Sequence, residues 1–329
     1  MYVVGGRNKK NAERLEAHEG FDKAIVLSFD ESGRFVRTEL AYTAPPDVGP
    51  EQNASVLFAA GALVGERLYL CTQTEVMIYR VPDFARVAYF SLPCFNDLHH
   101  VMPSRTGTLF IADTGLDAVL EVTEAGELLR EWDVWSGGDL WSRCSRATDY
   151  RRIPSTQPHL VHPNFVFDID GEIWVTRLEQ QDALRLVPGP ATLPIGIERP
   201  HDGIVFDGRV YFTIVDGHIV RADPIRRAVE TVYDLQEIFR TPYPLGWCRG
   251  LKMLDRDRLI VGFSRLRPTP LKANVRWVRR RLKATLGLDA SKEWDVFPTR
   301  LACIDLARGE VLWEANLEPY EMHAVFSIL

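Results

Sequence analysis

Histidines begin four separate apolar stretches of this chain, in His99-His100-Val, His162-Pro-Asn, His201-Asp-Gly and His323-Ala-Val. The whole chain has only eight histidines, so this placement uses most of them. Neutral imidazole is the most common protein ligand for zinc, copper and iron. Three or four converging imidazoles would form a metal site with an open position for water or substrate. We therefore predict a divalent metal, with zinc, iron or copper favoured over calcium.

The predicted ligands are His99, His100, His162, His201 and His323. Successive residues of a strand face opposite sides, so His99 and His100 cannot both point inward, and a register slip of one residue would exchange them. Histidines at a repeated position can also be architectural, donating to a backbone carbonyl of a neighbouring element. The sequence leaves both interpretations open.

Polar residues lie beside these histidines, at Asn96, Asp97, Asn164 and Asp202. A carboxylate next to a ligating histidine can fix its tautomer. We predict that Asn96, Asn164 and Asp202 contact substrate and that Asp97 assists catalysis. The alternative for each Asn or Asp is the capping of a turn.

A further stretch, Trp247-Cys-Arg249-Gly, carries no histidine at the equivalent place. Arg249 is predicted to bind a carboxylate or phosphate, and Trp247 to stack on a flat substrate. Arg249, Asp97 and His323 are the predicted catalytic residues.

The elements that carry these residues form a repeated unit of four short apolar runs. The second run of each unit starts at a turn, as in Gly65–Cys71, Gly107–Asp113, Gly171–Arg177, Gly208–Ile214 and Asp257–Gly262. Asp-Gly between two apolar runs is a strong hairpin signal. A four-stranded antiparallel unit repeated at roughly 55 residues predicts the blades of a β-propeller with insertions.

The two ends of the chain supply a sixth unit. Runs at 2–4, 24–28 and 35–39 give three strands, and 323–328 gives a fourth. Pairing N-terminal strands with the C-terminal strand closes the ring and removes exposed sheet edges. We predict an all-β fold in which residues 1–329 form a single six-bladed β-propeller domain.

Three insertions interrupt the units, at 5–22, 135–161 and 264–298. Their positions predict that all three emerge on one face, where binding sites of rigid scaffolds usually lie. The third contains a basic helical pattern at 273–286, with Val275, Val278 and Leu282 on one stripe. It is interpreted as a lid, a membrane-surface helix or a partner-docking helix, or as a surface helix packed on the propeller.

Composition narrows the class of protein. The formal net charge of −6 argues against a general nucleic-acid binder. Five cysteines without a Cys-x-x-Cys pair are unlike a disulfide framework or a zinc knuckle. No run reaches the length of a membrane span and no signal-like core is present, which predicts a cytoplasmic protein.

The phrases His162-Pro-Asn-Phe-Val-Phe-Asp-Ile-Asp-Gly-Glu-Ile-Trp-Val-Thr and Gly107-Thr-Leu-Phe-Ile-Ala-Asp-Thr-Gly resemble NHL-repeat proteins. They also resemble the six-bladed group of gluconolactonase (SMP-30-like) enzymes, strictosidine-synthase-like proteins and virginiamycin B lyase. The resemblance is clearest over residues 95–225. Asn96-Asp97 is similar to the Asn-Asp pair of the gluconolactonase-like metal site, but that family's Glu motif in the first blade has no counterpart. The lyase resemblance implies a histidine base, for which His323 or His201 would serve.

Two functional hypotheses follow. The first is a metal-dependent hydrolase, lactonase or lyase with a histidine-lined site at the mouth of the central channel, acting on a small anionic or carbonyl-containing substrate. The second is a non-catalytic propeller that binds a small ligand or a protein through its loop-bearing face. The helix at 273–286 would serve a protein partner or a membrane surface.

Overall fold

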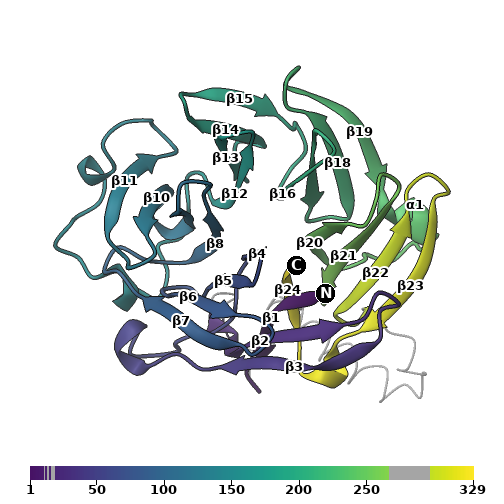
Figure 1. Ribbon diagram of the computed structural model, residues 1–329, viewed down its shortest axis with the longest axis horizontal. Helices are drawn as coiled ribbons and strands as arrows, with labels where there is room; N and C mark the ends of the chain where they lie inside the picture. Colours follow the sequence, from purple (N-terminus) through teal and green to yellow (C-terminus); the bar gives the residue numbers. More distant parts are fainter. Residues whose placement is uncertain (11, 13–14, 16–18, 267–296) are drawn as a thin grey trace, which may run out of the picture.

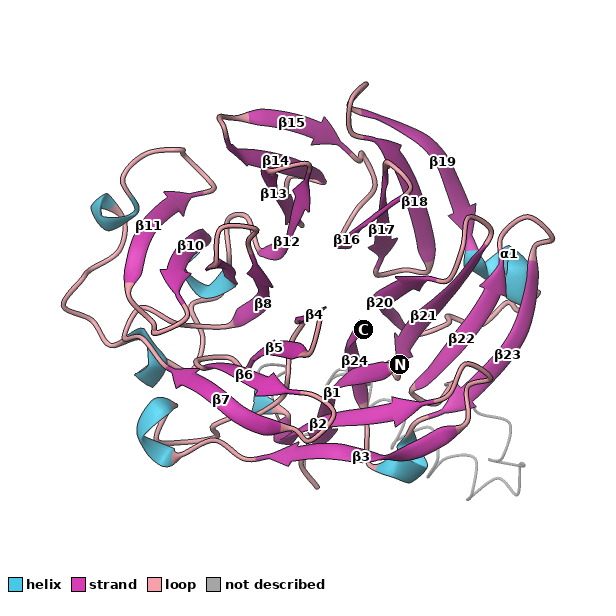
Figure 2. Cartoon of the chain, in the orientation of Figure 1, coloured by secondary structure: helices cyan, strands magenta, loops and turns pink. Residues whose placement is uncertain are grey.

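The computed structural model describes residues 1–10, 12, 15, 19–266 and 297–329. Within these residues, six four-stranded antiparallel sheets stand in a ring (Figure 1). Nearly all regular structure is strand, and the helices are short pieces in the connections between strands (Figure 2). The predicted six-bladed propeller is therefore confirmed.

The first three blades are given from the innermost strand outward. Blade 1 contains β24 (Ala324–Ile328), β1 (Tyr2–Asn8), β2 (Phe21–Phe29) and β3 (Phe35–Tyr42). Blade 2 contains β4 (Ala62–Val64), β5 (Arg67–Cys71), β6 (Val76–Arg80) and β7 (Ala85–Phe90). Blade 3 contains β8 (Leu98–Pro103), β9 (Thr108–Asp113), β10 (Ala118–Thr123) and β11 (Leu128–Asp133).

The other three blades follow the same order. Blade 4 contains β12 (Pro163–Ile169), β13 (Glu172–Arg177), β14 (Asp182–Val187) and β15 (Ala191–Pro194). Blade 5 contains β16 (Pro200–Phe206), β17 (Arg209–Ile214), β18 (His218–Asp223) and β19 (Ala228–Asp234). Blade 6 contains β20 (Trp247–Met253), β21 (Arg258–Ser264), β22 (Arg300–Asp305) and β23 (Glu310–Asn316), and α1 (Leu235–Phe239) precedes it.

Blade 1 closes the ring as predicted, because β24 pairs with β1 antiparallel from Val3↔Ile328 to Gly6↔Ala324. Gly5 makes this approach possible. A Cβ at Gly5 would lie 1.8 Å from the carbonyl oxygen of Ala324, which no side chain could tolerate.

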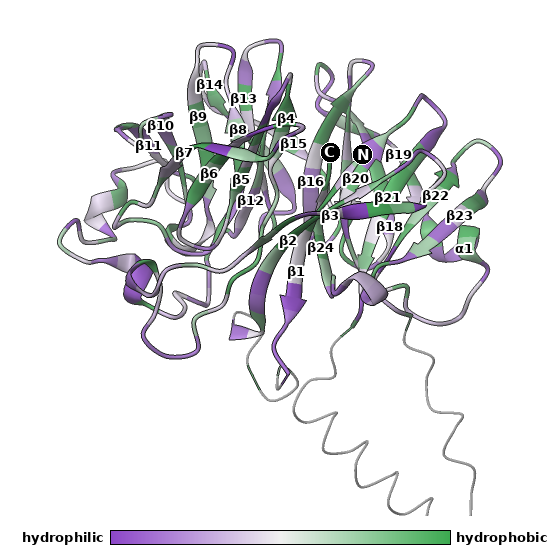
Figure 3. Cartoon of the chain, turned by 60° about the horizontal axis from the view of Figure 1, so that its bottom comes forward, coloured by the Kyte–Doolittle hydropathy of each residue, from purple (hydrophilic) through white to green (hydrophobic). Residues whose placement is uncertain are grey.

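The core lies between the faces of adjacent blades. Hydrophobic residues concentrate along the strands and hydrophilic residues at many of the turns (Figure 3). Phe167 of blade 4 meets Phe212 of blade 5 edge to face, with ring centroids 6.0 Å apart. Such contacts bury both faces of each sheet, which fixes the inner strands around the axis of the ring.

The inner strands of all blades except blade 2 carry an irregularity in register near the end where the predicted site residues lie. One or two residues stand there without a partner on the second strand: His99, Asn164, Asp202 with Gly203, Gly250, and Phe326. Such β-bulges bend a strand locally and re-aim its side chains. The bulges therefore decide which residues face the axis.

The connection at 135–161 joins β11 to β12 and contains two 3₁₀ turns, Leu140–Ser142 and Tyr150–Arg152. Arg152 Nη1 donates to the carbonyl oxygens of Pro46 and Gly49, in the segment between blades 1 and 2. That segment in turn contacts the connection between β1 and β2, because Lys9 Nζ donates to the carbonyl of Asn53. The first two insertions thus both contact the segment between blades 1 and 2.

The helix predicted at 273–286 lies outside the described residues. Among the residues that the structure describes, no helix is long and apolar enough to cross a membrane.

Candidate functional site

Three histidine rings from consecutive blades lie beside one another at the inner strands. The His99 ring centroid is 4.8 Å from that of His162 and 6.1 Å from that of His201. His99 is in β8, His162 directly precedes β12, and His201 is in β16. The fold therefore brings close together three rings that span about a hundred positions of sequence.

His201 is the one of these three rings in which both nitrogens lack a hydrogen-bond partner. It is fully buried. Its nearest carboxylate, Asp202 Oδ1, is 3.8 Å from Nδ1, which is too long for a hydrogen bond. Burial lowers the pKa of His201 well below its usual value, and the charge of Arg249 acts in the same direction. The ring is therefore neutral near pH 7 and keeps an unshared electron pair.

His99 has one nitrogen fixed by the backbone. Its Nδ1 lies 2.9 Å from the carbonyl oxygen of Asp97, and a carbonyl can only accept. Nδ1 therefore carries the hydrogen, and Nε2 carries the electron pair. Burial lowers the pKa of His99, against the opposing charge of Asp97.

His162 also presents one open nitrogen. Its Nε2 is buried without a hydrogen-bond partner, and its Nδ1 lies 3.1 Å from Nδ1 of His159. Burial is the main cause that lowers the pKa of His162 well below its usual value, and repulsion from charges on His99 and His159 lowers it further. The left-handed backbone of His162, at φ 57°, turns the chain sharply into β12.

Arg249 brings a positive charge to the same site. Its guanidinium lies over the rings of Trp247 and Phe326, at 4.9 and 5.1 Å from their centroids. Its Nε is buried and has no hydrogen-bond partner. Burial lowers the pKa of Arg249 to about 10, against the opposing charges of Asp202 and Asp97, so the group stays charged at pH 7. A charged fork with an open donor is suited to an anion.

Asp202 and Asn164 line the same region from their bulges. Asp202 Oδ2 accepts from the Thr213 hydroxyl at 2.6 Å and from the Gly250 backbone N–H at 2.9 Å. Burial raises the pKa of Asp202 to about 6. Asn164 Nδ2 donates to the carbonyl of Pro200, and its Oδ1 is buried without a partner. Asp202 therefore connects blade 5 to blade 6 by a hydrogen bond, and Asn164 connects blade 4 to blade 5 in the same way.

His100 lies in the interface between blades and not at the axis. Its Nδ1 accepts from the backbone N–H of Val166 at 3.0 Å, and its Nε2 lies 3.3 Å from the carbonyl of Gly61. Its ring stacks on Phe165 at 3.7 Å. With both nitrogens bonded to backbone, His100 has none left for a metal, and the structure gives it the architectural role.

His323 stands at the start of blade 1. Its Nδ1 accepts from the backbone N–H of Asn8 at 3.3 Å. As a neutral ring it then carries its hydrogen on Nε2, which is the reverse of the arrangement in His99. Its predicted roles as a ligand and a base stay predictions.

Asn96 and Asp97 hold neighbouring segments in place. Asn96 Nδ2 donates to the carbonyls of Tyr150 and Ile153 in the 135–161 connection. Asp97 has a left-handed backbone and supplies the carbonyl that fixes His99. Asn96 therefore acts on the connection, and Asp97 acts through its backbone and its charge.

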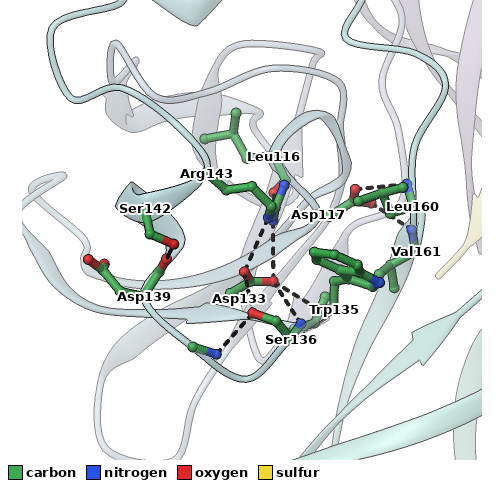
Figure 4. Close-up of polar contacts among 12 residues, drawn as sticks. Leu116, Asp117, Asp133, Trp135, Ser136, Asp139, Ser142, Arg143, Leu160 and Val161 are labelled. Carbon is green, nitrogen blue, oxygen red and sulfur yellow. Dashed lines mark hydrogen bonds and ion pairs between the residues drawn. The ribbon is translucent and has the colours of Figure 1, made fainter.

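Two further residues hold His162 in place, and the sequence analysis did not identify either of them. Asp117 accepts three backbone N–H groups with one carboxylate: Leu160 on Oδ2, and Val161 and His162 on Oδ1, all within 3.0 Å. Figure 4 shows this carboxylate beside the Leu160–Val161 backbone, near the Arg143–Asp133 ion pair that anchors the same connection. His159 is the second, and its spacing of three residues from His162 was the available signal.

The donor set fits a transition metal in part. The open nitrogens of His99, His162 and His201 are borderline-soft ligands of the correct kind. However, the described residues contain no group of three His, Cys, Asp or Glu arranged to hold a metal ion, and a guanidinium shares the site. The predicted metal stays a prediction.

A separate groove of about 620 Å³ lies outside the axial site, between β11 and the end of β14 with Pro188. Its arginines are already paired, Arg130 with Glu121 and Arg146 with Glu131. It therefore offers no open charged group comparable to Arg249.

Comparison with known proteins places the chain by fold alone. No family model and no curated protein matches it. A crystal structure of a protein of unknown function from Bacteroides caccae matches with a TM-score of 0.61 at 13% identity, covering 99% of this chain and 97% of the other. A streptogramin B lyase structure matches with a TM-score of 0.50 at 13% identity, covering 96% and 83%. The narrower NHL-repeat or SMP-30-like group is not shown by these matches.

Proposed function

We propose that this chain is a hydrolase, lactonase or lyase that binds a small anionic or carbonyl-containing substrate near the axis of the ring. The observation that carries the proposal is the meeting of neutral imidazoles with open nitrogens, at His162 and His201, with the open guanidinium of Arg249. Anion binding alone would need only the guanidinium. The proton-accepting nitrogens beside it support a reaction.

The roles follow from the charge and protonation of each group. Arg249 would hold a carboxylate or phosphate of the substrate, with Trp247 against its flat part. His201 or His162, neutral near pH 7, would take a proton from water or from a carbon next to a carbonyl. A lyase stands among the structures that share this fold, so eliminations are the first reactions to test.

A metal-assisted version of the same site is the second candidate. It is favoured by the three rings of His99, His162 and His201, whose neighbouring centroids are 4.8 and 6.1 Å apart. These residues would hold the ion. A bound divalent ion would supply activation of water or polarisation of a carbonyl.

Binding and turnover of a substrate panel test the proposal. The panel contains lactones, esters and carboxylates with a leaving group β to the acid, and binding is followed by Trp fluorescence. We expect Arg249→Met to weaken binding about tenfold or more, and His201→Gln to lower turnover by about 10²-fold or more with binding retained. Arg256→Met is the matched control, because Arg256 is an exposed arginine paired with Asp207. Binding without any turnover would favour the non-catalytic alternative.

Metal analysis of protein purified without a His tag tests the second candidate. We expect His162→Ala and His201→Ala each to abolish metal retention. The melting temperature of the metal-free fold should be nearly unchanged in His201→Ala, because the His201 ring makes no hydrogen bond. His100→Ala is the control and should lower stability without affecting the metal. Less than about 0.2 metal per chain, with no rise on reconstitution, would count against a metal centre.

A further inference from the structure

A line of hydrogen bonds runs from His162 into the 135–161 connection, and the sequence patterns did not reveal it. It passes from His162 to His159 at 3.1 Å, from His159 to Thr156 at 3.3 Å, and from Thr156 to Asn96 at 3.3 Å. We propose that this line fixes the tautomer of His162, so that its hydrogen is on Nδ1 and its buried Nε2 is a permanent electron-pair donor. His159, Thr156 and Asn96 are then positioning residues for the site.

Asn96 determines which atom donates and which accepts in each hydrogen bond of this line. Both hydrogens of its amide nitrogen are used, since Nδ2 donates to the carbonyls of Tyr150 at 2.8 Å and Ile153 at 2.9 Å. This orients the amide, so Oδ1 faces Thr156 as an acceptor. The Thr156 hydroxyl therefore donates its single hydrogen to Asn96 Oδ1.

The positions of the remaining hydrogens follow from the donation by Thr156. Thr156 Oγ1 can then only accept from His159, so the hydrogen of the neutral His159 ring is on Nε2. His159 Nδ1 carries the electron pair and can only accept from His162. The hydrogen of His162 is thus on Nδ1, which leaves the unpartnered Nε2 bare.

This arrangement matches the neighbouring ring. His99 reaches the same tautomer by another route, because its Nδ1 donates to the carbonyl of Asp97. Two adjacent rings, in edge-to-face contact at 4.8 Å, thus both keep Nε2 as the basic atom. The inference rests on the proposed function for its significance, because a base or a metal ligand needs this bare nitrogen.

Nitrogen-15 NMR of histidine-labelled protein tests the inference without a substrate, because the protonated and bare nitrogens of a neutral imidazole resonate far apart. His162→Gln identifies the His162 signals. We expect a single Nδ1–H form for His162 in the unmodified chain and in Thr156→Ser, which keeps the hydroxyl. Thr156→Val removes both hydrogen bonds and should give a mixture of the two tautomers, with the melting temperature close to that of Thr156→Ser.

Two outcomes would overturn the inference: a His162 ring with its hydrogen on Nε2 in the unmodified chain, or an unchanged single tautomer in Thr156→Val. The proposed function is tested separately, by measuring turnover of the substrate panel. The expected tautomers without any turnover would leave the inference standing and remove the enzyme proposal. Turnover that falls in Thr156→Val and is restored in Thr156→Ser would support both.

Discussion

At the scale of single residues, the two adjacent histidines of blade 3 have opposite roles. His100 gives both nitrogens to backbone groups of its neighbours, whereas His99 keeps Nε2 open beside His162. The sequence predicted that a histidine would stand here but could not choose between them. The choice depends on a bulge at His99, and a bulge is a property of strand pairing that no local residue pattern specifies.

Asp117 offers a sharp test at this scale, because a single carboxylate holds the three backbone N–H groups that lead into His162. In Asp117→Asn one oxygen becomes an amide that faces an N–H group, so an acceptor is lost. We expect a stability loss of about 1–3 kcal/mol and ligand binding weakened about tenfold. Urea unfolding and fluorescence titration with the substrate panel measure the two effects.

Asp139→Asn is the matched control for that variant. Asp139 lies in the same connection and caps the backbone N–H of Trp141, away from His162. Its substitution should leave ligand binding unchanged. Equal loss of binding in both variants would mean that the connection acts as a whole and that Asp117 has no special part.

At the scale of elements, the bulges in the inner strands determine which side chains point toward the axis of the ring. Hairpin signals and apolar runs were sufficient to predict most strands, but β15 (Ala191–Pro194) was missed. It is short and follows Pro188, Gly189 and Pro190, which hide the apolar pattern of a strand. The edge strand nevertheless forms because Leu193 is fully buried against its blade.

A buried carboxylate between blades 1 and 2 gives a prediction for these elements. Glu75 accepts from the hydroxyls of Tyr42 at 2.5 Å, Tyr89 at 3.0 Å and Thr72 at 2.8 Å. Burial raises its pKa, so its favourable contribution is complete below the ordinary carboxyl range and is lost as pH rises through the folded-state pKa.

We therefore expect Glu75→Gln, which keeps an acceptor and carries no charge, to gain stability relative to the unmodified chain as the pH is raised from 5 to 8. Glu75→Ala should lose about 1–3 kcal/mol, because three hydroxyls lose their acceptor. Urea unfolding at pH 5 and pH 8 measures both, with the exposed Glu66→Ala as control. A neutral effect of Glu75→Ala would show that water replaces the carboxylate freely.

At the scale of the whole molecule, the architecture was predictable because each blade repeats the same local signals and the two ends supply complementary strands. Closure follows from the pairing of β24 with β1. The site was predictable only as a set of histidines near the axis. Its hydrogen-bond pattern depends on contacts between blades and on an insertion without periodic sequence, such as the one that carries Thr156 and His159.

Burial of histidines around the ring makes stability depend on pH. Burial lowers the pKa of His100 to about 4, and it also lowers those of His99, His162 and His201. Between about pH 6.5 and 4 the unfolded chain binds a proton at His100 that the folded chain does not, so stability falls as pH is lowered through this window. The other three histidines act in the same direction below about pH 6.5.

We expect the free energy of unfolding of the metal-free protein to fall by about 1.4 kcal/mol per pH unit for each such histidine. Asp202 acts in the opposite direction, since its raised pKa of about 6 gives stability that is lost as pH rises. Urea unfolding between pH 7.5 and 4.5 measures the slope. His100→Gln should reduce it by the contribution of one histidine, and an unchanged slope would contradict this assignment.

The pairing of β24 with β1 has a consequence for biosynthesis. The ribosome makes β24 only after all the other blades have been made, so blade 1 waits with three strands while blades 2 to 6 emerge. During that interval β1 has an unpaired edge, and Phe326, which packs on Arg249, does not yet exist. The surroundings of the buried Arg249 guanidinium are therefore complete only when β24 is inserted.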